Sequence, residues 1–242
     1  MKLDHADPLA AAAATAIQHG DRAGLHALLE AHPGLARARI VSDGTNCGPG
    51  ERALLHIATD WPGHFPDVAA TIADLVAAGA DPDARFVGAH AETPLHWAAS
   101  SDDVAAVDAL LDAGAAIDAP GAVIGGGSPL ADACAFRQWQ AAERLVARGA
   151  QVRLDQAAAL GLFDRLQQLV QAQAPDPEAL SDALWMACHG GRQACAEYLL
   201  GQGADLNWVA PWEPATPLDA AVRSGADELA GWLRGQGARS AA

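Results

Sequence analysis

The chain has 242 residues, with 30 acidic against 15 basic side chains and a net charge of −15. Hydrophobic residues make up 51% of it, which excludes a mostly disordered chain because enough apolar surface is available for a core. The acidic balance disfavours binding to nucleic acid and to anionic membrane surfaces, since both need a basic patch that releases counterions.

The N-terminal segment shows none of the features of a targeting sequence. Residues 1–8 lack the basic start and the apolar core of a secretory signal. The apolar run at 9–17 is too short to span a bilayer. The cysteines form no CxxC pair and no regular disulfide spacing; they are Cys47, Cys134, Cys188 and Cys195. We therefore expect a cytoplasmic protein that has no membrane contact.

Two local signals recur along the chain at a spacing of about 35 residues. Apolar segments end at Gly-Ala, where glycine suits the left-handed residue after a helix C-terminus; these pairs begin at Gly79, Gly114, Gly149, Gly203 and Gly237. Upstream, Thr or Ser before Pro-Leu marks a helix start, because the hydroxyl caps a free N–H and proline loses no hydrogen bond there; these triplets begin at Thr93, Ser128 and Thr216. Each unit predicts a short helix, a turn, a longer helix and a loop.

The motif at Thr93 to Ala99, T-P-L-H-W-A-A, matches the repeat signature T-P-L-H-x-A, and G-A-D-P-D-A from Gly79 is close to the signature's usual ending. On these motifs the chain resembles the ankyrin repeat family, as a stand-alone domain of bacterial type. The resemblance implies that His56 and His96 are structural. It also implies an all-α solenoid of about seven helix-turn-helix repeats, with irregular terminal repeats and enlarged inter-repeat loops. We expect one domain over 1–242, with repeats near 8–40, 51–91, 92–126, 127–153, 154–180, 181–215 and 216–242.

Four segments depart from the repeat pattern, and such departures are where function is most often added. The Gly-rich segment 41–50 predicts a flexible finger, and whether it closes over the concave groove is left open. The insertion 59–67 carries two aromatic residues that cover a ligand or pack locally. The three glycines of 121–127 allow close backbone approach or simple flexibility, and they lack the P-loop pattern. The segment 207–214 holds two Trp residues that cap the last repeat or wall a pocket.

Alignment of the first helices places Trp97 and Asp132 at equivalent positions of adjacent repeats, about 8–10 Å apart. A carboxylate at position 132 is costly if it is buried dry, so it needs Arg137, a loop amide or a ligand as a partner. The turn at Asp102 and Asp103 offers paired carboxylates, which bind a metal, divide acid and base roles, or cap the next helix.

The resemblance implies a non-catalytic module that binds a macromolecular partner through its concave face and fingertip loops, and the charge favours a basic partner. The alternative is a small-molecule-binding protein or hydrolase with a Trp-walled, Asp/His-containing pocket on that face. A third interpretation is repeat drift, with the aromatic residues serving only as caps.

The candidate residues follow from these alternatives. The candidates for catalysis are Asp60, His64, Asp132 and His189. The candidates for ligand or partner binding are Trp61, Phe65, Trp97, Asp102, Asp103, Phe136, Trp208 and Trp212. No HExxH or GxSxG motif is present, so enzymatic activity stays open. We expect no cofactor, no metal and, without heptads, a monomer.

Overall fold

The computed structural model describes residues 1–44 and 48–241. Contacts within the chain divide it into two compact units, Met1–Ala150 (unit 1) and Gln151–Ala242 (unit 2). We describe each unit by itself. None of the helices in the described ranges is both long and apolar enough to cross a membrane.

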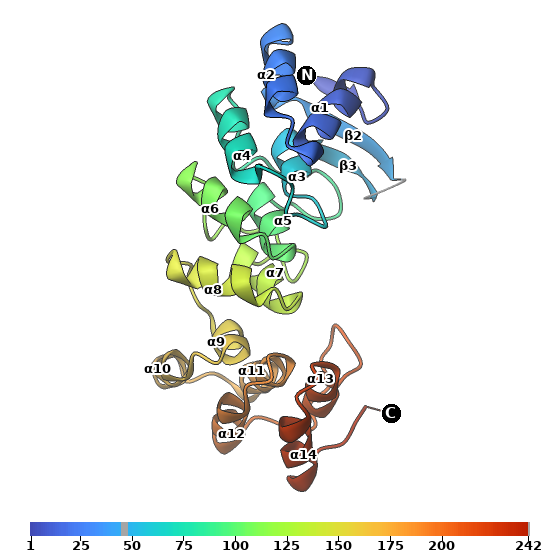
Figure 1. The fold of residues 1–242 in the computed structure, drawn as a ribbon. Coiled ribbons are helices and arrows are strands. Elements are labelled where there is room, and N and C mark those ends of the chain that lie inside the picture. The colour runs from blue at the N-terminus through green and yellow to red at the C-terminus, as the bar shows by residue number, and fades with distance from the viewer. Residues whose placement is uncertain (45–47, 242) are drawn as a thin grey trace. The chain divides into compact units, whose positions relative to one another are not determined.

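Unit 1 is built from alternating helices that form antiparallel pairs. In Figure 1, the first helices of the pairs line up in one column and the second helices in another. The first helices are α1 (Pro8–His19), α3 (Leu54–Ala58), α5 (Pro94–Ser100) and α7 (Pro129–Ala135). The second helices are α2 (Arg22–Ala31), α4 (Val68–Ala77), α6 (Val104–Asp112) and α8 (Trp139–Ala147).

The local signals account for the helix boundaries in this unit. Helices α5 and α7 begin at the proline after Thr93 and Ser128. Glycine in the left-handed region follows the ends of α4, α6 and α8, at Gly79 (φ +98°), Gly114 (φ +91°) and Gly149 (φ +98°). The expected helix-turn-helix units are therefore present.

Two buried histidines connect successive pairs. The Nε2 of His56 donates to the Glu92 carbonyl at 3.1 Å, and the Nε2 of His96 donates to the Gly127 carbonyl at 3.3 Å. Burial lowers the pKa of His56 to about 3 and that of His96 to about 4, so both rings are neutral at pH 7. These bonds give both residues the structural role that the resemblance implies.

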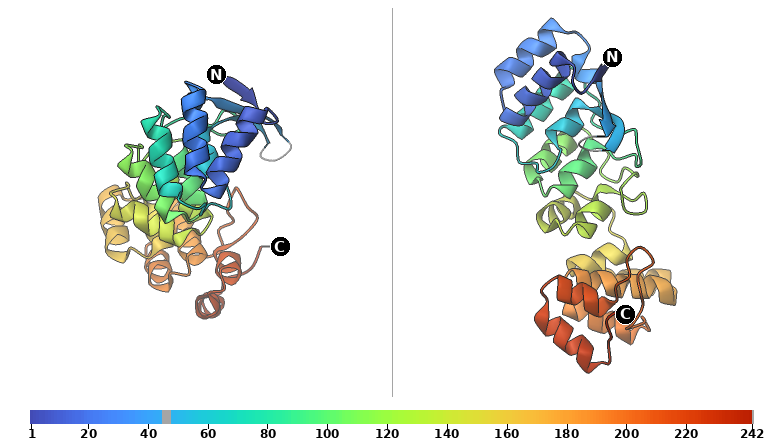
Figure 2. Two further views of the ribbon diagram at one scale, coloured as in Figure 1. Left: turned by 45° about the horizontal axis from the view of Figure 1, so that its top comes forward. Right: turned by 90° about the vertical axis from the view of Figure 1, so that its right-hand side faces the viewer.

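A three-stranded sheet lies at the N-terminal end of unit 1, in addition to the helices of the largely helical fold that was predicted. Its strands are β1 (Lys2–Asp4), β2 (Arg39–Gly44) and β3 (Gly48–Ala53), in the order β1-β2-β3. Strand β1 pairs parallel to β2, and β2 pairs antiparallel to β3, with Arg39 opposite Ala53. Figure 2 shows the strands beside the first helices of the unit. A 3₁₀ turn, Leu35–Arg37, leads into β2.

The sheet corrects the prediction of a flexible finger at 41–50. Its flanks are paired strands, whereas the tip at 45–47 lies outside the described residues. The backbone of Glu51 in β3 bonds that of Val87 in both directions, at 2.9 and 3.0 Å. A Cβ at Gly50 would lie 2.4 Å from the Phe86 ring and 2.7 Å from the Val87 carbonyl oxygen, so glycine is required for this close approach.

Unit 2 contains three further helix pairs. They are α9 (Leu154–Leu160) with α10 (Phe163–Gln173), α11 (Pro177–His189) with α12 (Gln193–Gly201), and α13 (Pro217–Arg223) with α14 (Asp227–Gly235). Helix α11 packs between α9 and α13. The pair α9–α10 lacks the T-P-L-H motif, and the Gln156 side chain takes the place of its histidine by accepting the Arg153 N–H at 2.9 Å.

Candidate functional site

The predicted site residues fall in both units, so they form two groups. Unit 1 holds Asp60, Trp61, His64, Phe65, Trp97, Asp102, Asp103, Asp132 and Phe136. Unit 2 holds His189, Trp208 and Trp212. The pocket walled by Trp residues from both groups stays a prediction.

The insertion between α3 and α4 is fixed to the following repeat. The His64 backbone N–H donates to Asp103 Oδ2 at 2.6 Å, and the His64 Nε2 donates to the Ser101 carbonyl at 3.1 Å. Gly63 lies against the same turn, since a Cβ there would be 2.9 Å from the Ser101 Cβ. These two bonds of His64 thus hold the loop in place.

The tip of this insertion presents Trp61 to solvent. Asp60, the residue before it, forms an ion pair with Arg52 at 2.7 Å and accepts the Trp61 N–H at 3.0 Å. The Trp61 side chain is 80% exposed, whereas Phe65 is half-buried. The carboxylate of Asp60 therefore supports the loop, and the indole lies in solvent.

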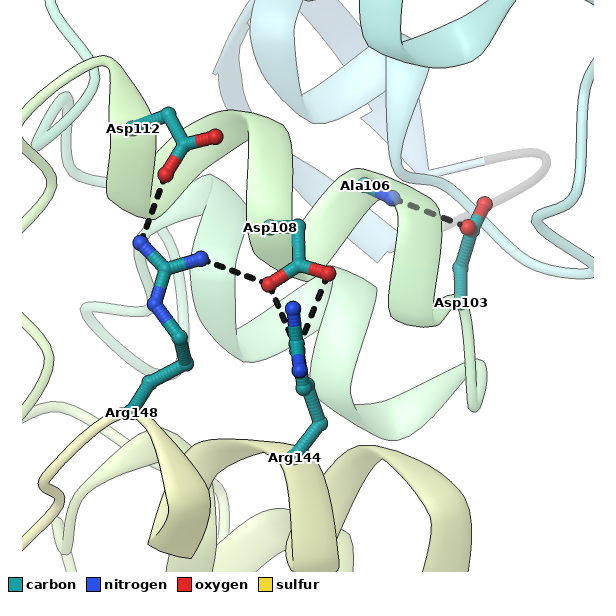
Figure 3. Close-up of polar contacts among 6 residues, drawn as sticks. All are labelled: Asp103, Ala106, Asp108, Asp112, Arg144 and Arg148. Carbon is teal, nitrogen blue, oxygen red and sulfur yellow. Dashed lines mark hydrogen bonds and ion pairs between the residues drawn. The ribbon is translucent and has the colours of Figure 1, made fainter.

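Asp102 and Asp103 act as helix caps. Asp103 is buried, and its Oδ1 accepts the Ala106 N–H at the start of α6 at 3.0 Å (Figure 3). Asp102 accepts the Ala141 N–H of α8 at 2.7 Å and the Gln140 side-chain amide at 3.2 Å. Across the described ranges, no group of three or more His, Cys, Asp or Glu side chains is placed to hold a metal ion.

A set of ion pairs joins α6 to α8, and sequence analysis missed it. Asp108 accepts from Arg144 at 2.7 Å and from Arg148 at 2.6 Å, and Arg148 also reaches Asp112 at 2.6 Å (Figure 3). Hydrogen bonding from Arg144 lowers the pKa of Asp108. The four-residue spacing of each like-charged pair on two successive second helices was the available signal.

Asp132 lies beneath the loop at 121–127, and its partner is a loop amide. Its side chain is 0% exposed, and Oδ1 accepts the Ile124 N–H at 3.4 Å. Within the part of the chain that the structure describes, Oδ2 has no hydrogen-bond partner. Burial raises the pKa of Asp132 to about 7, and the charge of Glu92 adds to the shift. Of the three partners considered, the structure shows the loop amide.

Glu92 and Trp97 complete this cluster. Glu92 is 8% exposed, and burial raises its pKa, although a hydrogen bond from the Trp97 side chain opposes the shift. The Trp97 ring packs edge-on against His56 at 4.8 Å and lies 5.6 Å from Phe86. The expected proximity of Trp97 and Asp132 thus runs through Glu92, which sequence analysis missed. Phe136, 44% exposed, ends α7 outside this cluster of contacts.

Four aromatic rings gather in unit 2, and we call them the Trp corner: Trp185, His189, Trp208 and Trp212. Trp185 and His189 stack at 5.2 Å with 18° between their planes. Trp212 meets Trp185 edge-on at 5.8 Å and 80°, and Trp208 meets Trp212 at 5.5 Å and 63°. Trp185 is buried, and its Nε1 donates to the Ala215 carbonyl at 3.1 Å, whereas Trp212 is 54% exposed.

Only part of the Trp corner was predicted from the sequence. His189 and both loop residues were candidates, but Trp185 was not. Its spacing of four residues before His189 on one helix was the signal that could have found it. The loop 207–214 packs its Trp212 against α11, so the insertion is anchored to the repeat that precedes it.

The repeated helix pairs correspond to a known family of sequences. The sequence model for ankyrin repeats in three copies matches residues 154–240, and the model for a single ankyrin repeat matches residues 91–122. The chain is an ankyrin repeat protein. No curated protein matches it.

Ankyrin repeats are generally protein-interaction modules. In unit 1 of this ankyrin repeat protein, two adjoining hollows of about 450 and 630 Å³ lie along α4 and α6 and share Ala69 and Ala105. The first is also lined by His64, Phe65 and Asp103. The hollows border the second helices, whereas Trp97 and Asp132 belong to first helices.

Proposed function

We propose that this ankyrin repeat protein binds a protein partner, and that Trp61 and Trp212 make central contacts. The observation that carries the proposal is the exposure of these indoles, 80% and 54%, on loops that are otherwise held by specific contacts. Tryptophan dominates binding energy at many interfaces because it buries a large apolar area and offers one N–H donor. Each indole would be a contact for the partner within its own unit.

The two loops that carry Trp61 and Trp212 are ordered before any partner binds, which favours a role in binding. The bonds of Asp60 and His64 hold the first loop, and the ring contacts of Trp212 hold the second. A contact residue that is already ordered loses less conformational entropy on binding. Both Trp residues are therefore presented in a form suited to a partner.

The geometry gives less support to the hydrolase. Asp60 is in an ion pair, His64 bonds a backbone carbonyl, and Asp103 caps a helix, so none of the three is poised to act on a substrate. Asp132 is buried beneath a loop.

We further propose that the helix pairs form seven repeats of a single domain. In this proposal the first helices and the fingertip loops face the partner, and the protein is monomeric.

Selection from a phage-displayed library of random peptides tests this function. We expect the full chain to select a consensus peptide, and we expect Trp61→Ala or Trp212→Ala to bind that peptide about tenfold more weakly, the loss typical of a central aromatic contact. Val222→Ala is the matched control, because Val222 is 48% exposed but belongs to neither loop. The proposal fails if no consensus emerges, or if both Trp variants bind as tightly as the parent chain.

A further inference from the structure

The Trp corner has the geometry of a site for a flat cation. Its rings meet at steep angles of 80° and 63°, so the edge of one ring lies on the face of the next. Trp212 lies between Trp185 and Trp208 in this series and keeps 54% of its surface in solvent. The face of an indole is electron-rich and attracts cations, and tryptophan does so more strongly than the other aromatic residues.

A carboxyl group stands on the same side of α11. Asp182 lies three residues before Trp185, and His189 lies four residues after it, so the three positions share one face of the helix. The Asp182 side chain is half-buried, and burial raises its pKa to about 7, with the charge of Asp155 adding to the shift. A carboxyl group in this setting gains from the approach of a positive charge.

The charges near Asp182 leave a negative balance. The neighbouring ionisable groups are Asp155, Glu178 and Arg153, and the guanidinium of Arg153 already bonds Asp155 at 3.2 Å. Glu213, the residue after Trp212, is paired with Arg223, so those two charges offset one another. Over residues 151–242 as a whole, acidic residues outnumber basic ones as well. A positive group is therefore the complementary occupant.

We propose that the Trp corner binds an arginine side chain of the partner, with the guanidinium against the exposed surface of Trp212 and with Asp182, on the same face of α11 as Trp185, as an acidic group that attracts it. The inference rests on the proposed function and names the chemistry of that partner: a peptide segment with an exposed arginine. Arginine fits better than lysine because its planar, weakly hydrated guanidinium stacks on an aromatic face. A proline-rich segment, which also docks on aromatic surfaces, is the competing occupant.

Titration of the full chain with short capped peptides tests this assignment. The probes are tetra-arginine, tetra-lysine, tetra-citrulline and tetraproline, and the readout is the NMR signal of each indole N–H, assigned with single Trp→Phe variants. We expect tetra-arginine to shift the Trp212 and Trp208 signals with saturation, and to bind about tenfold more tightly than uncharged, isosteric tetra-citrulline. Equal binding of tetra-citrulline or tetraproline would overturn the assignment, and so would tighter binding of tetra-lysine.

Variants separate this site from general attraction to an acidic surface. Trp212→Ala should weaken tetra-arginine binding about tenfold, and Asp182→Asn should weaken it about threefold. Trp212→Phe, which keeps a smaller aromatic face, should lie between Trp212→Ala and the parent chain, and it guards against a packing defect in the alanine variant. Val222→Ala, which changes an exposed side chain outside both Trp-bearing loops, should leave tetra-arginine binding unchanged. If Trp212→Ala and Trp212→Phe both keep the parent affinity, arginine binds elsewhere and the proposal is wrong.

The peptide library distinguishes failure of this inference from failure of the function. A consensus that depends on Trp212 but contains no arginine would leave the protein-binding function standing and overturn the arginine site. The absence of any consensus would overturn the function itself.

Discussion

Asp132 occupies the position that Trp97 holds in the preceding repeat, and this single replacement changes the chemistry beneath the loop at 121–127. Its carboxyl group is fully buried beside Glu92, and only one of its oxygens accepts a hydrogen bond. Ionising such a group is costly because the charge loses its hydration without gaining a counterion. The folded protein therefore holds the proton of Asp132 more tightly than the unfolded chain does.

This difference predicts a pH dependence of stability. The pKa of Asp132 is about 7 in the folded state against 3.8 for the ordinary side chain. Between those values the unfolded chain releases the proton first, so the free energy of unfolding falls as pH rises, by at most about 4 kcal/mol in total, and levels off above about pH 7. Asp132→Asn should lack this contribution. Urea unfolding of both proteins at about pH 4 and about pH 8 measures it.

The comparison of variants is needed because other buried groups act in the opposite direction. The lowered pKa values of His56 and His96 make stability rise with pH over part of the same range. They do so equally in both proteins, so the difference between the two pH profiles isolates Asp132. Parallel profiles would contradict the prediction.

At the scale of single residues, the sequence was informative where a residue differs from the one usual at its position in the repeat. The need of Asp132 for a partner followed from the cost of a buried charge, and both Trp97 and Asp132 interact with Glu92. Glu92 and Trp185 were missed because their burial depends on which neighbours pack over them, and that is set by three-dimensional contacts. Whether Asp132 or the other candidates act in binding stays a prediction.

At the scale of elements, the strands show the limit of local patterns. Helix starts and ends could be predicted from neighbouring residues, because capping and left-handed glycines are local effects. The segment 41–50 carries the same glycines as a loop, yet its flanks pair with β1 and with Val87, which are distant in the chain. No local sequence pattern indicates pairing with residues so distant in the chain, so the sheet was not predicted.

Gly50 makes this pairing testable. A methyl group there would press on the Phe86 ring and on a backbone oxygen, and the backbone can yield only by opening the bridge between Glu51 and Val87. Gly50→Ala should lower stability by about 1–3 kcal/mol, the usual cost of overpacking. Gly231→Ala in α14, where the new methyl group meets nothing within 4 Å, should be neutral or stabilising. Thermal unfolding by circular dichroism compares them, and an unchanged midpoint for Gly50→Ala would count against the contact.

At the scale of the whole molecule, the net charge of −15 acts on every encounter with a partner. Long-range attraction between opposite charges raises association rates, and salt screens it. Short-range ring contacts instead set the dissociation rate of a complex. Composition thus predicts the sign of the partner's charge, although it says nothing about where the contact forms.

Salt should therefore affect the association rate of tetra-arginine more than its dissociation rate. Raising the sodium chloride concentration from about 0.05 to about 0.5 M should slow association at least about tenfold, while dissociation changes little. Stopped-flow tryptophan fluorescence measures both rates, and sodium sulfate at equal ionic strength is the control for a specific chloride effect. A salt dependence carried mainly by dissociation would be inconsistent with long-range steering.

The histidine bonds from α3 and α5 couple the stability of each helix pair to that of the pair that follows it. Each ring is seated in its own helix pair and donates to the backbone just before the next first helix, at Glu92 and then at Gly127. Ala131 stands at the corresponding position of α7 and has no side-chain donor, so the succession of links ends there. Loss of order in either pair breaks the bond that the two pairs share, since a hydrogen bond needs both of its partners. Disorder at α3, α5 or the start of α7 is therefore coupled in both directions, whereas Ala131 extends this coupling no further.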